Sequence, residues 1–329
     1  TSEANAQINL NADTDIAGRN ITVATHAASN PKSNSANELF ALSYARSEIY
    51  SKVNIASGVK LEATSDVTIS STALNDVGSS AASSSLGATQ SDAKANITVA
   101  VAESVTEIGG TVSTDSQIIA GGDVDIRSSL IRANVVEAAA GGFDDGTVGI
   151  SLAISLMDDS VTATAGGLIV AGGDVVIDAG IDTLDNIVLA TSEIGVSAVG
   201  KTGGEKVQDF RQGIKDKNAS AANGLKAPSA FILKKLGLVK EAKTPEVKEF
   251  VFSGALAIAD HQTKTEAKVA SDTKVFADGG VFVASLNMDK PEISAKSTTK
   301  INVSADKKED PKKQDDVNYG ISVAINVGV

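Results

Sequence analysis

The chain has 329 residues, a formal charge of −12, 42% hydrophobic residues and only 3% aromatic residues. It contains no cysteine, which excludes disulfide-stapled folds, thiol redox chemistry and cysteine-ligated zinc. The acidic balance argues against nucleic acid as the main partner, because a phosphate backbone needs a basic surface, and no stretch approaches the roughly 20 consecutive apolar residues of a membrane span.

Four segments of the sequence repeat one pattern. They run from Leu39 to Ile69, from Ile97 to Ile126, from Val148 to Ile177 and from Phe252 to Val283, and a fifth begins at Tyr319. Each has an alternating apolar run, a polar turn, a second alternating run, and a Gly-rich corner before a short β-branched strand. Self-similarity of this kind predicts stacked units in which each unit completes its neighbour's core.

The corners and the strands after them have recognisable signatures. Val124 and Ile126 alternate with polar residues, as in a half-buried strand. Gly121 and Gly122 come just before, and glycine permits the sharp bend and the close backbone approach that such a corner needs. Asp123 follows the glycines and is predicted to hydrogen-bond its own backbone as a turn residue.

These corners carry few hairpin signals, so consecutive strands are expected to pair in parallel with the coils above and below. Parallel crossovers are nearly always right-handed. The sequence therefore predicts an all-β, right-handed parallel β-helix (a β-solenoid) with one inserted helical hairpin. We expect coils of roughly 20–25 residues, about two to a repeat, and some twelve coils stacked into a rod on the order of 60 Å long.

The insertion divides the solenoid into residues 1–202 and residues 251–329, which continue the same stack. Residues 203–250 contain ten Lys or Arg and six Asp or Glu, a local charge of +4 in an acidic chain. Apolar residues at helical spacing predict two amphipathic helices. The candidate partner-binding residues on their faces are Phe210, Ile214, Phe231, Ile232 and Leu236. These faces pack on each other or on the side of the solenoid, form a platform for a partner or ligand, or bind an anionic membrane surface.

Catalytic and metal-binding patterns are not found in the sequence. His26 and His261 each lie in an ordinary polar stretch, without ligands at metal spacing, and we expect both to be structural. Three acidic pairs, at residues 144–145, 158–159 and 315–316, are expected to be solvated turns. Weak calcium binding is the alternative for them, and glycan cleavage by paired carboxylates is the least favoured. We therefore expect no catalytic residue, no metal ligand and no cofactor.

The segments VGISLAISLMDDSVTATAGGLIVAGGDVVIDAG (148–180) and YGISVAINVGV (319–329) resemble the repeats of giant secreted bacterial adhesins. These are the filamentous-haemagglutinin-like and leukotoxin-type filamentous adhesin families. The resemblance covers about residues 39–202 and 251–329. It implies an extracellular or cell-surface rod that displays binding elements away from the envelope, and it supplies no catalytic residues.

The functional expectation is a structural stalk segment of a large extracellular adhesin, and not an enzyme. Its partner would be a protein or glycan on a host or neighbouring cell, in attachment or biofilm cohesion. The alternative is a self-associating cell-envelope filament or surface-layer component, and a glycan-active β-helical enzyme ranks third. Residues 320–329 look like the start of another repeat, so we expect the chain to be part of a longer protein.

Overall fold

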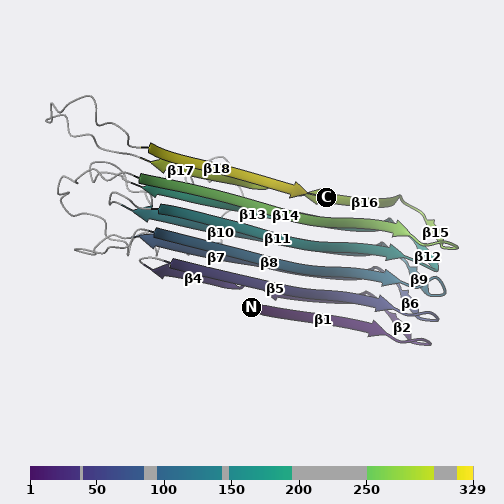
Figure 1. Cartoon of the computed structure of the whole chain (residues 1–329). Coiled ribbons are helices and arrows are strands. Elements are labelled where there is room, and N and C mark those ends of the chain that lie inside the picture. Colours follow the sequence, from purple (N-terminus) through teal and green to yellow (C-terminus); the bar gives the residue numbers. More distant parts are fainter. Residues whose placement is uncertain (38–39, 85–94, 143–147, 195–249, 300–316, 329) are drawn as a thin grey trace, which may run out of the picture.

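The structure is a computed structural model, and it describes residues 1–37, 40–84, 95–142, 148–194, 250–299 and 317–328. Within these ranges the elements are all strands, and every strand pairing is parallel. The expected all-β parallel solenoid is confirmed (Figure 1). Its right-handed sense stays a prediction. The helical hairpin falls on residues 203–249, which lie outside the described ranges, and Phe250 already begins a strand.

Three sheets wrap the solenoid (Figure 1). Sheet A has the order β1 (Ser2–Leu10), β5 (Phe40–Ile55), β8 (Ala95–Val112), β11 (Val148–Ala165), β14 (Phe250–Val269) and β18 (Val317–Gly328). Sheet B has the short strands β2 (Asp15–Gly18), β6 (Lys60–Ala63), β9 (Gln117–Ala120), β12 (Leu168–Ala171) and β15 (Lys274–Ala277). Sheet C has β3 (Ile21–Ser29), β7 (Val67–Ser84), β10 (Val124–Gly142), β13 (Val175–Ile194) and β16 (Val281–Met288), with β4 (Lys32–Asn37) on β7 and β17 (Glu292–Thr299) on β13.

Each repeat makes one coil, which is much longer than the sequence predicted. Phe40 pairs with Ile97 and Ile97 pairs with Ile150, so equivalent positions are 57 and 53 residues apart. The expectation of two short coils per repeat is wrong, because the two alternating runs on either side of the polar stretch belong to one strand of 16 to 20 residues.

The proportions of the molecule change accordingly. At about 3.3 Å per residue, the long strands of sheet A extend for roughly 60 Å. Six strands spaced about 4.8 Å apart span only about 24 Å along the stacking axis. The described part is therefore a short stack of wide coils, and the predicted 60 Å length lies along the strands rather than along the solenoid axis.

The Gly-rich corners between sheets B and C are glycine because adjacent coils approach closely there. A Cβ on Gly172 would lie 2.3 Å from the carbonyl oxygen of Gly121 in the preceding coil. Neither glycine has a positive φ. The close approach expected from the sequence is thus confirmed at these corners, whereas left-handed backbone is not what requires glycine there.

The aspartates at the same corners tie one coil to the next. The backbone N–H of Asp174 donates to Oδ1 of Asp123 at 2.8 Å, and the N–H of Asp123 donates to Oδ1 of Asp66 at 3.0 Å. The N–H of Gly280 continues the series by donating to Oδ1 of Asp174 at 2.6 Å. The prediction that these carboxylates bond within their own turns is wrong, because the backbone N–H groups they reach belong to the neighbouring coil.

The interior contains two different apolar clusters along the length of the coil. Where all three sheets meet, large side chains such as Ile69, Ile126 and Ile177 are fully buried. Farther along, where only sheets A and C face each other, the cluster is mostly alanine, including Ala100 and Ala153. Small side chains suit a two-sheet interior, and the change of residue size follows the change in cross-section.

Candidate functional site: a buried polar seam

A row of buried polar side chains lies between the two apolar clusters. In sheet C the register aligns Ser29, Asn75, Arg132 and Thr183 at this level. These four residues, together with the polar residues that they and their partners contact, form what we call the polar seam. Its further members are Ser47, Ser104, Thr106, Asn134, Ser155, Asp159, Asn186, His261 and Asp289.

The seam is neutral in the first coils. The hydroxyl of Ser47 on sheet A donates to the hydroxyl of Ser29 on sheet C at 2.7 Å. One coil further, the amide of Asn75 donates to the hydroxyls of Ser104 and Thr106, at 2.5 and 3.1 Å. These bonds cross the interior and satisfy polar groups that would otherwise be costly to bury.

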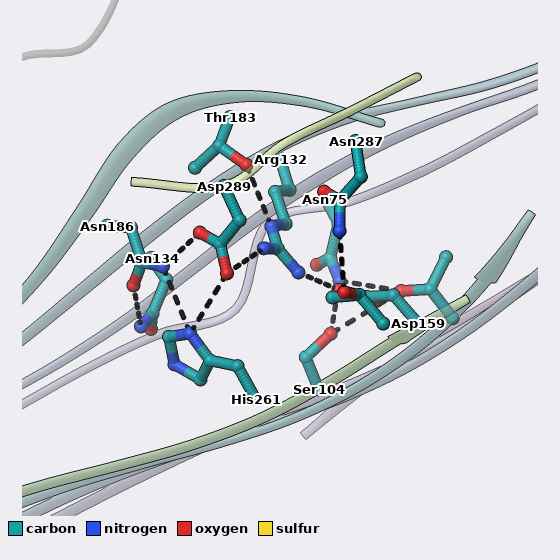
Figure 2. A network of polar contacts seen from close by, with 12 residues as sticks. Asn75, Ser104, Arg132, Asn134, Asp159, Thr183, Asn186, His261, Asn287 and Asp289 are labelled. Atoms are coloured by element: carbon teal, nitrogen blue, oxygen red, sulfur yellow. Dashed lines mark hydrogen bonds and ion pairs between the residues drawn. The ribbon is translucent and has the colours of Figure 1, made fainter. Parts of the chain in front are cut away.

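The seam becomes ionic at Arg132. This residue is only 1% exposed, and its guanidinium lies between two carboxylates, one in β11 and one in the segment between β16 and β17 (Figure 2). It forms an ion pair with Asp159 of sheet A, and its Nη2 lies 2.8 Å from Oδ2 of Asp289. The third contact is a hydrogen bond from Nε to the hydroxyl of Thr183 at 3.0 Å. The arginine therefore joins sheet A to two coils of sheet C.

His261 completes the seam beside the arginine. Its Nε2 lies 2.9 Å from the hydroxyl of Ser155, and its Nδ1 lies 3.1 Å from Nδ2 of Asn186 and 3.4 Å from Oδ2 of Asp289. Asn134 donates from Nδ2 to Ser155 at 2.7 Å and to the amide oxygen of Asn186 at 3.3 Å. Figure 2 shows the ring between this amide cluster and the Asp289 carboxylate.

The backbone of sheet C is irregular at the level of the seam. The register between β10 and β13 slips by one residue between Thr183 and Asp185, so Leu184 forms a bulge. In the next coil the ladder is interrupted between β16 and β17, and Asp289 and Pro291 lie in this gap. Bulges and prolines occur where a ladder is interrupted or lies at an edge. The gap is where the Asp289 carboxylate reaches Arg132.

The two carboxylates of the seam differ in their proton affinity. Burial raises the pKa of Asp159 above its ordinary value, and the charge of Arg132 opposes that rise. Burial also acts to raise the pKa of Asp289, but its hydrogen bond with His261 and the charge of Arg132 outweigh burial and hold this pKa at about 2. Asp289 is therefore the permanently ionised partner of the guanidinium near neutral pH.

The centre of the seam is closed to solvent, while the side chain of Asp289 at its end is 16% exposed. Arg132, Asp159 and His261 are each 2% exposed or less, so a substrate in solution does not reach their polar atoms. No cluster of three or more His, Cys, Asp or Glu in the described part of the chain is arranged to hold a metal ion. In the same residues, no helix has the length and apolar character needed to cross a membrane. The arrangement can act structurally, by fixing how sheet A lies against sheet C.

The structure changes some of the sequence-based site predictions and leaves others open. The acidic pair at 158–159 is not a solvated turn, because it lies within β11 and Asp159 faces the interior. The partner-binding candidates Phe210, Ile214, Phe231, Ile232 and Leu236 lie outside the described residues, as do the acidic pairs at 144–145 and 315–316. The sequence analysis missed Arg132 and Asp289, which no local pattern marks: Arg132 follows Leu130 and Ile131, and Asp289 stands just before Lys290 and Pro291.

Comparison of the chain with protein-family models, with curated proteins and with solved structures finds no match. The class of the protein is therefore stated from its own geometry. It is a parallel β-solenoid with wide coils, Asp-linked corners and an internal polar seam.

Proposed function

We propose that the chain is a structural stalk segment of a large extracellular bacterial adhesin, which supports attachment or biofilm cohesion. The observation that carries the proposal is the in-register stacking of its coils. Each long strand of sheet A from β5 to β14 pairs in parallel with the strand of the coil on either side. Such a stack extends by repetition and gives a stiff support for binding elements.

The proposed role is non-catalytic and needs no cofactor. The resemblance of residues 148–180 and 319–329 to giant adhesin repeats supports an extracellular or cell-surface location. In this role the stalk displays a contact element toward a protein or glycan of a host or neighbouring cell. Residues 203–250 are the candidate element, because their basic and apolar composition differs from that of the coils.

A binding experiment tests this proposal. The full chain and a variant in which a short linker replaces residues 203–250 are applied to an array of glycans and matrix proteins, with calcium and with a chelator. Binding that disappears with residues 203–250 identifies them as the adhesive element. Turnover of an arrayed polysaccharide by the full chain would contradict the non-catalytic role.

A further inference from the structure

The first half of each long strand of sheet A has its large and small residues on unexpected sides. In β11, Ser151 and Ala153 face the interior and are fully buried, while Ile150 and Leu152 face outward. In the second half of the same strand the large residue is inside, as at Val161. An outer face in water needs no large aliphatic residues, so the inversion requires an explanation other than the core.

The inversion recurs in every neighbouring strand, and the register aligns it into ladders. We call the outer apolar face the outward residues of sheet A within 40–44, 97–101, 150–156, 252–258 and 319–327. All of these outward positions hold aliphatic or aromatic residues except for one glycine, and none is charged. At the levels of Ile150, Leu152 and Ile154 the face therefore crosses five strands without interruption by a charge.

The outer apolar face is large enough for a stable protein interface. Ten of its side chains are 38–54% exposed. At about 150–250 Å² for each of the three aromatic side chains and roughly 60–120 Å² for each of the seven aliphatic ones, these exposed fractions amount to on the order of 600 Å² of apolar area. The less exposed members of the face add to it. The largest apolar patch of a typical monomer is about 300–600 Å², whereas each partner in a standard interface contributes about 800 Å².

The charges around this face indicate how a partner is placed. The charged outward residues of sheet A begin at the last level of the face, where Arg46, Glu103 and Asp260 lie in register with Leu156 and Val327. They continue beyond it with Lys52 and Glu107. The border thus lies on one side only. A second copy can be rotated by 180° about an axis that runs parallel to the solenoid axis and lies in front of sheet A. The two sheets A then face each other with antiparallel strands, the apolar halves overlap, and the charged halves project on opposite sides.

We propose that the outer apolar face binds the same face of a second copy of this chain, which gives a laterally paired solenoid. A second copy carries the same ladders at the same coil spacing of about 4.8 Å, so each row of side chains meets a matching row. This two-fold arrangement is self-complementary and closed. It keeps the two solenoid axes parallel, so the pairing extends over every coil that carries the inversion. The proposal stands independently of the adhesin role.

Analytical ultracentrifugation of the full chain tests the proposal. We expect a monomer–dimer equilibrium. Ile150→Glu or Ile321→Glu should raise the dissociation constant of the dimer by about tenfold or more. Both residues are exposed at the outer apolar face, at 38% and 54%. Ser160→Glu is the matched control on the same strand, because Ser160 lies in the second half of β11, and it should leave the equilibrium unchanged. Circular dichroism checks that each variant retains its β-structure, and the second glutamate variant replaces the first if one fails.

Three results would overturn lateral pairing. A full chain that stays monomeric over the whole accessible concentration range would do so directly. Val283 lies on β16, an end strand of sheet C in the described part of the chain. Association that is lost with Val283→Glu and kept with Ile150→Glu would therefore be end-to-end stacking instead. A full chain that stays monomeric while the variant lacking residues 203–250 dimerises would show that the chain's own insertion occupies the outer apolar face.

Discussion

Replacing Arg132 by methionine tests whether the polar seam holds the two sheets together as an ionic unit. The change removes the guanidinium from a position that is 1% exposed and leaves Asp159, which is equally buried, without its counter-ion. Asp289 keeps its contacts with His261 and Asn186, so the loss falls mainly on Asp159. Breaking a buried ion pair from one side typically costs about 3–5 kcal/mol, and we expect about 3 kcal/mol here.

The second half of this prediction is that removal of both charges is milder than removal of one. Arg132→Met combined with Asp159→Leu removes the two fully buried charges and fills the space with apolar atoms, while Asp289, whose side chain is 16% exposed, keeps its contacts with His261 and Asn186. Such replacements are typically neutral or stabilising, so we expect the double variant to recover at least half of the loss. The cost of Arg132→Met alone should also shrink as the pH is lowered, because Asp159 can then become neutral by binding a proton.

Guanidinium-induced unfolding followed by circular dichroism measures these free energies. The matched control is Lys52→Met, which removes a partner of the exposed pair with Glu107 (2.6 Å) and should cost less than about 1 kcal/mol. If Arg132→Met costs no more than this control, or if the double variant is as unstable as the single one, the seam does not act as an ionic unit.

Three further predictions concern pH, the corners and the insertion. The pKa of Asp289 is about 2 in the folded chain and 3.8 ordinarily, so its contribution to stability is complete above about pH 4 and is lost as the pH falls toward 2. In an acid titration followed by circular dichroism, an Asp289→Asn variant should lose less stability across this window than the unchanged chain. Gly172→Ala should cost about 2 kcal/mol or more, because its Cβ would meet a carbonyl oxygen at 2.3 Å, whereas Gly180→Ala, with its nearest atom at 3.9 Å, should change the unfolding midpoint little. Replacing residues 203–250 by a short linker should preserve the β-type circular dichroism spectrum, and its loss would show that the coils on the two sides do not share a core.

The strands and the parallel stacking were predictable because they depend on local signals. Alternation marks the faces of a strand, and the glycines at 121–122 and 172–173 stand at the same place in the second and third repeats. The coil length was not predictable in the same way. Polar residues at inward positions, such as Asp159 and Ser104, interrupt the apolar alternation and look like a turn when only the sequence is read. They are strand residues whose partners lie in other strands.

The seam itself was hidden for a related reason. Arg132 and Asp159 are 27 residues apart, and Asn186 and Asp289 are 103 residues apart, so no local spacing announces their contact. His261 was expected to have a structural role, and its side chain is buried. Its neighbours depend on the bulge in sheet C at Leu184, which the sequence does not mark with glycine or proline.

The seam and the outer apolar face are connected through register. A slip of one residue would exchange the two faces of a strand. A slip of two residues toward the cluster of large side chains would keep the faces but move the charge of Asp159 to the level of Val161 and Ile108. The seam therefore penalises both slips, and it does so at the level where the large residues change sides. Since the outward ladders stay aligned only if every coil keeps this register, a variant that loses the Arg132 pair should weaken lateral pairing as well as folding. Measurement of the dimer constant of Arg132→Met under conditions where it remains folded distinguishes this coupling from two independent features, because independence predicts an unchanged constant.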